Sequence, residues 1–222
     1  MNQRVLVWDL PTRIFHWLLA ASFAGAWLTA ESERWRDVHM MLGYTVAGLI
    51  LFRIVWGLVG TRYARFRSFL FRPTELLGYL RSLLSRSPRH YLGHNPAGSV
   101  AIFLLLGLGL VTAASGFAYY QELGGEWLEE VHEAAAVIML WIVGVHVAGV
   151  LVSSLLHREN LVGSMLNGRK RGEPGDGIAR RHAGVALVLI ALAAGLWAWY
   201  PAGGDVANEV RAVQHDDDDE RG

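Results

Sequence analysis

The chain has 222 residues, of which 53% are hydrophobic and only 18% are charged, so it is more apolar than an ordinary soluble domain. Lys plus Arg and Asp plus Glu number 20 each, which leaves no net charge, although the basic residues are concentrated in particular loops. The absence of cysteine excludes disulfides, thiolate metal sites, iron–sulfur clusters and covalently attached haem c. Histidine, with nine copies, is then the abundant ligand for a soft metal.

Apolar segments long enough to cross a bilayer recur along the chain, since a span needs about 20 residues. After a polar lead-in that ends in Pro11 and Thr12, five spanning helices are predicted at residues 13–30, 38–59, 96–120, 131–156 and 183–200. Asn95 and Pro96 form a cap and a first helical position, which fixes the start of the third. The short amphipathic run at residues 74–84 is predicted to lie at the membrane interface.

The first segment also resembles a secretory signal peptide, with basic residues, an apolar core and small residues before Glu31. Because His16 and several tryptophans interrupt that core, we interpret it as a retained span. The acidic end of the chain, residues 202–222, is expected to be a disordered solubilising tail; metal binding by His215 and its aspartates, or attraction of a basic cytochrome c, is the alternative.

Orientation follows from the loops, because Lys and Arg concentrate on the cytoplasmic side of a membrane protein. The N-terminus and the loops after the second and fourth helices carry fifteen of these residues, and the alternate loops and tail carry four. A multi-pass protein of the bacterial inner membrane is predicted, with its N-terminus in the cytoplasm and its C-terminus in the periplasm. This rule also accounts for the arginine-rich loops without nucleic acid.

The fourth segment carries two histidines, His132 and His146, fourteen residues apart. At about 100° per residue this spacing falls some 40° short of four turns, so both imidazoles share one face of the helix. At about 1.5 Å per residue they stand roughly 21 Å apart along the axis, one toward each side of the membrane. One helix therefore offers two stacked nitrogen ligands.

Depth in the membrane pairs these histidines with two others. His16 near the start of the outward-running first helix matches the cytoplasmic level of His146, and His39 near the start of the second helix matches the periplasmic level of His132. Small residues follow one turn after three of the four, at Ala20, Gly43 and Ala136, and the third helix carries Gly107, Gly109 and Gly116; both patterns suit close packing or a flat cofactor.

The chemistry of these pairs favours haem b, because two axial imidazoles complete the coordination of an iron already held by four ring nitrogens. Two such haems stacked across the membrane are suited to electron transfer. Arg53, on the His39 face at the inner depth, is predicted either to pair with a propionate of the inner haem or to extend to the cytoplasmic headgroups.

Four stretches of sequence resemble the prokaryotic cytochrome b561 and nickel–iron hydrogenase b-subunit family: PTRIFHWLLA, VHMMLGYTVAGLILFRIVWG, GHNPAGS and VHEAAAVIMLWIVGVH. They cover roughly residues 8 to 166, and the paired histidines of the last are the most specific part. The resemblance implies a four-helix core that holds two haems b, exchanges electrons with quinone and a redox partner, and uses His16, His39, His132 and His146 as axial ligands.

Other histidines are given weaker roles. His94 is expected at the cytoplasmic edge as a cap or interfacial residue, with contact to a propionate or quinone as the alternative. His157 is an alternative inner ligand that lies close to the headgroups. His90 and His182 are predicted to be solvated loop residues.

Together these observations predict an all-α integral membrane four-helix bundle binding two haems, plus a fifth transmembrane helix. The expected divisions are a di-haem core at 1–166, a loop and fifth helix at 167–201, and a periplasmic tail at 202–222. The predicted function is electron transfer between the quinone pool and a partner such as a c-type cytochrome or an oxidoreductase subunit, as part of a quinone oxidoreductase or beside one, with homodimerisation left open. The competing functions are a histidine-lined proton or metal-ion transporter and a passive membrane anchor of an oxidoreductase.

Overall fold

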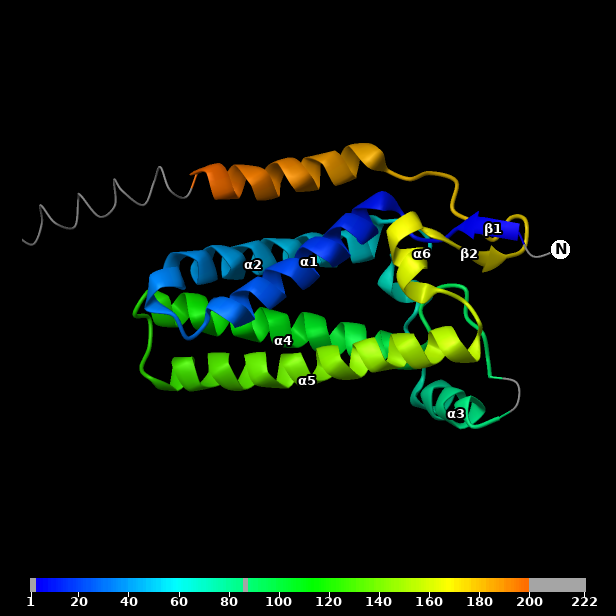
Figure 1. The fold of residues 1–222 in the computed structure, drawn as a ribbon, viewed down its shortest axis with the longest axis horizontal. Helices are drawn as coiled ribbons and strands as arrows, with labels where there is room; N and C mark the ends of the chain where they lie inside the picture. The colour runs from blue at the N-terminus through cyan, green and yellow to red at the C-terminus, as the bar shows by residue number, and fades with distance from the viewer. Residues whose placement is uncertain (1–2, 86–87, 200–222) are drawn as a thin grey trace, which may run out of the picture.

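The computed structural model describes residues 3–85 and 88–199, and most of these are helical. Four long helices lie side by side: α1 (Leu10–Thr29), α2 (Arg36–Val59), α4 (Pro96–Tyr120) and α5 (Trp127–Leu156) (Figure 1). A further helix at residues 183–199 runs along α1 and α2, and the acidic tail lies outside the described residues.

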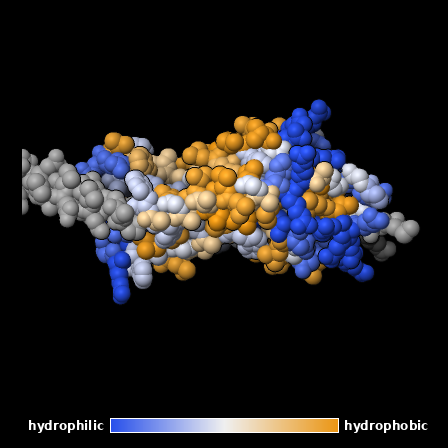
Figure 2. Space-filling view, turned by 90° about the horizontal axis from the view of Figure 1, so that it is seen from above, coloured by the Kyte–Doolittle hydropathy of each residue, from blue (hydrophilic) through white to orange (hydrophobic). Residues whose placement is uncertain are grey.

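Among the described residues, three helical segments are long and apolar enough to cross a membrane: Glu33–Val59, Pro96–Tyr120 and Trp127–Leu156. On the face shown in Figure 2, apolar side chains form a broad band across the middle of the molecule, and hydrophilic residues lie toward both ends. A bundle with an apolar exterior is expected where lipid is the solvent.

One end of the bundle carries the small elements and is called the sheet end below. It holds the antiparallel strands β1 (Gln3–Leu6) and β2 (Arg169–Gly172), together with α3 (Pro73–Leu83) and α6 (Leu161–Asn167). The other, called the loop end, carries the short connections α1–α2 and α4–α5.

Most helix limits lie close to those expected from sequence. Asn95 caps α4 as predicted, its side-chain oxygen accepting the N–H of Gly98 at 2.8 Å. The helix α1 begins three residues early because Asp9 caps it, accepting the N–H of Thr12 at 2.8 Å. The helix α5 also begins early, at Trp127. Glu129 and Glu130, which were assigned to the preceding turn, lie in its first turn, where their negative charges interact favourably with the positive end of the helix dipole.

The two-stranded sheet and α6 correct the expectation of an unstructured lead-in and an irregular loop after α5. The strands β1 and β2 are more than 160 residues apart, with Gln3 opposite Gly172 and Leu6 opposite Arg169. Such a pairing joins distant segments and leaves no local periodicity in a basic sequence. Gly168 ends α6 with a φ of +81°, a conformation that glycine adopts without strain.

The core lies between α1, α2 and α4 and also receives the helix at residues 183–199. Its buried members are Phe15, Val46, Leu49, Ile50, Leu106 and Leu189. Near the far end of this last helix, Trp197 donates its indole N–H to Thr45 Oγ1 at 3.0 Å, and Thr45 in turn donates to the carbonyl of Met41. The fifth apolar segment is therefore packed on the bundle through both apolar contacts and a hydrogen bond.

Candidate functional site

His39 on α2 and His132 on α5 face each other near the loop end, with ring centroids 6.1 Å apart and planes inclined at 69°. Two imidazoles that bind one metal ion from opposite sides would bring their centroids to roughly 6 Å, given a metal–nitrogen bond of about 2.0 Å on each side. The separation in the structure therefore fits a shared metal centre.

Backbone carbonyls orient both rings. His39 Nδ1 lies 2.9 Å from the oxygen of Ala26, and His132 Nδ1 lies 2.8 Å from the oxygen of Thr112. Because a carbonyl oxygen only accepts, each neutral imidazole carries its proton on Nδ1 and keeps the lone pair of Nε2. Metal-binding histidines are commonly held in this way.

Space for a bulky group adjoins this pair. A side-chain carbon added at Gly43, one turn from His39, would meet no atom within 4 Å, although the residue is half-buried. Gly116 is different, since an added carbon would lie 2.6 Å from His132 Nδ1. Gly109 packs against Ile50, whereas Gly107 is exposed, so the glycines of α4 serve separate purposes.

His16 on α1 and His146 on α5 lie toward the sheet end, close enough to interact electrostatically. His16 Nδ1 is buried and has no hydrogen-bond partner among the described residues, and its ring meets Trp17 edge-on at 5.1 Å. Leaving a buried nitrogen without a partner costs free energy. In the described part of the chain, Nδ1 of His16 lacks the carbonyl partner that orients His39 and His132. The structure thus brings the rings of His39 and His132 together and places His16 within electrostatic range of His146, whereas Ala20 is exposed.

Arg53 is 3% exposed. Its guanidinium carbon lies 4.8 Å from the ring centroid of Phe66 and 5.8 Å from that of Phe69. One terminal nitrogen, Nη1, is buried with no partner among the described residues. A buried cation with a free donor is suited to receive an anionic group.

His94 lies beside this cation and is not the cap of α4. Its ring centroid is 4.6 Å from Trp8 and 4.5 Å from Phe69, and Nδ1 is buried without a partner in the described part of the chain. Burial, followed by the positive charges of Arg53 and Lys170, lowers the pKa of His94 far below its ordinary value. The imidazole is therefore neutral at physiological pH and keeps hydrogen-bonding capacity.

Sequence reasoning missed Asp9, which is 1% exposed. Besides capping α1, its carboxylate accepts the indole N–H of Trp56 at 3.2–3.3 Å and the hydroxyl of Thr61 at 2.5 Å. The available signal was an aspartate two positions before a proline, which is a common start of a helix.

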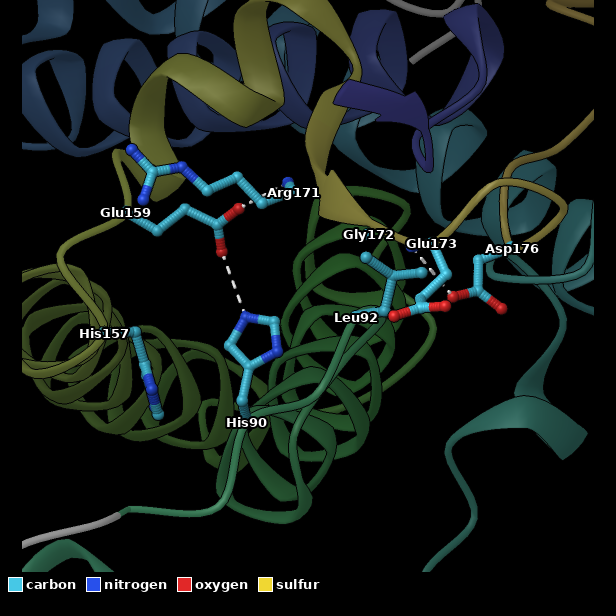
Figure 3. A pocket seen from close by; sticks show the side chains of 8 residues that line it. All are labelled: His90, Leu92, His157, Glu159, Arg171, Gly172, Glu173 and Asp176. Atoms are coloured by element: carbon cyan, nitrogen blue, oxygen red, sulfur yellow. Dashed lines mark hydrogen bonds and ion pairs between the residues drawn. The ribbon is translucent and has the colours of Figure 1, made fainter. Parts of the chain in front are cut away.

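A separate polar pocket of about 400 Å³ opens at the sheet end (Figure 3). His90 and Glu159 meet there at 3.2 Å, and the ring of His157 lies edge-on to His90 at 5.2 Å. His90 is an exposed loop residue, as predicted, that also contacts Glu159, and His157 has a histidine neighbour outside the two pairs. Among the described residues, no group of three His, Asp or Glu is arranged to hold a metal ion.

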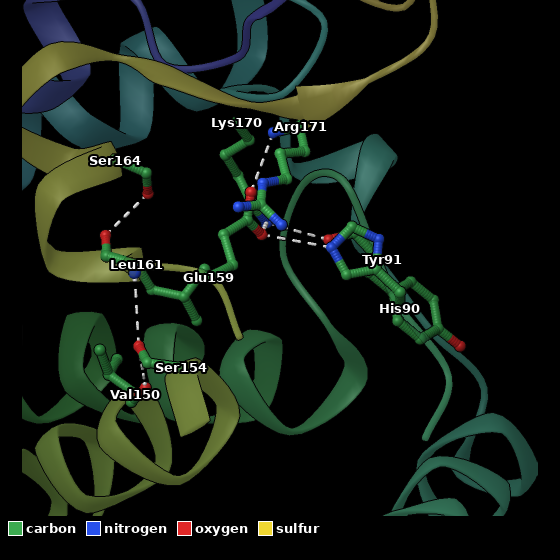
Figure 4. A network of polar contacts seen from close by, with 9 residues as sticks. All are labelled: His90, Tyr91, Val150, Ser154, Glu159, Leu161, Ser164, Lys170 and Arg171. Carbon is green, nitrogen blue, oxygen red and sulfur yellow. Dashed lines mark hydrogen bonds and ion pairs between the residues drawn. The ribbon is translucent and has the colours of Figure 1, made fainter. Parts of the chain in front are cut away.

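Glu159 links the sheet to the end of α5 (Figure 4). It accepts the N–H of Arg171 at 2.9 Å and lies 3.7 Å from Nζ of Lys170, which donates to the carbonyl of Tyr91. Burial by itself raises the pKa of Glu159, but the Arg171 N–H, Lys170 and His90 outweigh it and hold the pKa below the usual 4.5.

We expect Glu159→Gln to weaken the sheet end at neutral pH and to make it less sensitive to acid. Because folding lowers the pKa of Glu159, its stabilisation is present above pH 4.5 and is lost as the pH falls through the folded-state pKa. The thermal midpoint in detergent at pH 7 should drop by about 2–4 °C, the shift that about 1 kcal/mol produces in a protein of this size. If acidification lowered the thermal midpoint equally in the unchanged protein and in Glu159→Gln, this role of Glu159 would be contradicted.

Two pairs of half-buried histidines lie inside a bundle with three helical segments of membrane-spanning length, so the fold defines a helical membrane protein. The chain belongs to the prokaryotic cytochrome b561 family, whose model matches residues 7–168. It is therefore a b-type cytochrome with membrane helices, and its family transfers electrons in membranes with a partner.

Curated relatives carry hydrogenase names. The chain is 27% identical over 215 residues to a probable Ni/Fe-hydrogenase B-type cytochrome subunit of Rhizobium leguminosarum bv. viciae, covering 76% of this chain and 90% of the relative. The protein of the same name from Azotobacter vinelandii is 27% identical over 211 residues, covering 74% and 87%. A probable Ni/Fe-hydrogenase 1 B-type cytochrome subunit of Escherichia coli K12 is 29% identical over 143 residues, covering 52% and 60%. No solved structure gives a significant match.

Proposed function

We propose that the chain carries electrons across the bacterial inner membrane between the quinone pool and a redox partner protein, using two haems b. The observation that carries this proposal is the facing of His39 and His132, each with Nδ1 held by a backbone carbonyl and Nε2 left for a metal. When bound, each haem supplies an iron that accepts and returns one electron.

The residues that would hold the two haems lie at the levels of His132 and His146 on α5. His39 and His132 would hold the loop-end haem, and His16 and His146 would hold the sheet-end haem. Arg53, buried and with Nη1 unpartnered among the described residues, would receive a propionate of the sheet-end haem. The fourteen-residue spacing on one continuous helix supports a separation of roughly 21 Å between the two ligand levels.

Quinone is proposed to react at the sheet end. An apolar groove of about 170 Å³ lies between the starts of α3 and α4, and Phe69 lines it. The same Phe69 ring packs on His94, whose neutral imidazole is suited to hydrogen-bond a quinone oxygen. The groove thus adjoins the residues proposed for the sheet-end haem, and its apolar lining suits an isoprenoid quinone.

The partner is proposed from the names of the relatives, and the membrane topology is proposed from the charges of the loops. Since the relatives are named as hydrogenase subunits, we propose an oxidoreductase subunit as partner, with a c-type cytochrome as the other redox choice. The basic loops support a cytoplasmic sheet end, with α1 and the helix at residues 183–199 spanning beside the three longer helices. The di-haem core, fifth helix and periplasmic tail remain the proposed divisions, and homodimerisation is compatible with them.

Quinol-driven haem reduction tests the function. Purified protein should show sharp Soret and alpha bands in its reduced-minus-oxidised spectrum, and added quinol should produce them. A colourless protein would instead favour transport of ions by the histidines, and haem that quinol does not reduce would favour a passive anchor.

The variant Val100→Trp sharpens this test, because Val100 lines the groove and is 41% exposed. Added bulk there should slow quinol-driven reduction about tenfold or more while leaving haem content unchanged, since the groove would no longer admit the quinone. Val111→Trp is the matched control, as Val111 is similarly exposed on α4 but does not line the groove. Equal rates in the two variants would contradict the placement of quinone in the groove.

A further inference from the structure

Two opposite charges are buried at the sheet end of α1 and α2 without forming a direct ion pair. Asp9 is 1% exposed and Arg53 is 3% exposed. Among the described residues, the only ion pairs within 4.0 Å are those of Glu159 with His90 and Lys170. Burying a charge without a paired partner is costly, so this arrangement calls for an explanation.

The carboxylate of Asp9 is satisfied by neutral donors. The backbone N–H of Thr12, the indole of Trp56 and the hydroxyl of Thr61 all donate to it. These bonds fix its position where α1 begins and α2 ends, and they stabilise its negative charge without neutralising it.

Arg53 lies one turn before Trp56 on α2, so the cation and the indole that holds Asp9 share one face of the helix. Asp9 is the anionic group that acts electrostatically on Arg53. The remaining environment of the guanidinium is aromatic, from Phe66 and Phe69, and its Nη1 is unpartnered. The carboxylate of Asp9 thus offsets the positive charge of Arg53, whose Nη1 can still donate a hydrogen bond.

We propose that Asp9 is a positioning residue that sets the reduction potential of the sheet-end haem by offsetting the charge of Arg53. A negative charge near a redox centre disfavours the arrival of an electron, and in a medium of low dielectric constant this effect extends beyond direct contact. The inference rests on the proposed function, because it requires a haem held by His16 and His146.

The test is a redox titration of the two haems in Asp9→Asn. Asparagine keeps the size, the N-cap and an oxygen acceptor but removes the charge. The equilibrium constant for reduction of the sheet-end haem should rise by roughly tenfold, about 59 mV for one electron, with the loop-end haem unchanged. The sheet-end signal is the one lost in His146→Ala. Shifts of neither haem, or equal shifts of both, would overturn the proposal.

The control is Glu159→Gln, which removes a carboxylate at the same end that does not act on Arg53. It should leave both potentials unchanged. If Asp9→Asn assembles poorly, Asp9→Ser removes the charge while keeping a favoured N-cap, and it should raise the same potential.

The offsetting of the two charges is tested by Arg53→Gln, which should lower the potential of the sheet-end haem because it removes the cation that Asp9 offsets. An unchanged or raised potential in Arg53→Gln would overturn the proposal. Failure here is distinct from failure of the proposed function: protein without haem refutes the latter, whereas two haems with unshifted potentials refute only the role of Asp9.

Discussion

His132→Ala and His146→Ala are each expected to remove one haem, and a different one. Each variant deletes one of the two imidazoles that we propose as ligands of one haem, and the levels of His132 and His146 on α5 are roughly 21 Å apart. Haem content should fall from two per chain to about one in each variant, because an axial imidazole has no replacement within a pair. Haem extraction measures the number of haems that each variant retains, and redox titration of the remaining alpha band shows which haem it is.

His157→Ala provides the matched control for these variants. It also removes an imidazole from the α5 region, but this ring faces His90 in the separate polar pocket. Both haems should remain. Full haem content in both His132→Ala and His146→Ala would refute the ligand assignment, and loss of the same haem from both would refute the pairing by depth.

Gly116→Ala is expected to remove most of the loop-end haem although it changes no ligand. The added carbon would lie 2.6 Å from Nδ1 and 2.8 Å from Cε1 of His132, closer than side chains approach. The ring must then move and break the bond from Nδ1 to Thr112, which orients it. Small displacements of an oriented ligand lower metal affinity by about 10–100-fold. The haem-to-protein ratio and the remaining titration step measure the loss.

Gly107→Ala makes the same chemical change on the same helix. An added carbon there meets no atom within 4 Å, and Gly107 is exposed, so two haems should be retained. If the two glycine variants keep equal amounts of loop-end haem, the close approach of α4 to His132 is not what positions the ring.

The sequence was sufficient to predict the long helices and the neighbouring histidines, because both depend on local periodicity. Apolar runs mark the helices, Asn95 marks the start of α4, and a fourteen-residue interval places His132 and His146 on one face. Matching depths then required only the alternating direction of successive helices.

What the sequence did not reveal depends on contacts between distant segments. The strand pairing of Gln3–Leu6 with Arg169–Gly172 joins segments more than 160 residues apart, and basic residues there had a sufficient explanation in membrane orientation. From the sequence, Asp9 was interpreted as part of a polar lead-in, because its partners Trp56 and Thr61 are about fifty residues away along the chain. The burial of Arg53 depends on the packing of distant aromatic residues, so the sequence left its two alternatives open.

The central claim is that paired imidazoles hold two haems b in each chain, and haem stoichiometry measured on the purified full-length protein tests it most directly. Pyridine extraction against an amino-acid determination of protein should give two non-covalent haems b per chain, and the oxidised protein should show the low-spin signals of iron with two histidine ligands. A colourless protein, or one whose haem iron is high-spin with an open coordination position, would contradict the account.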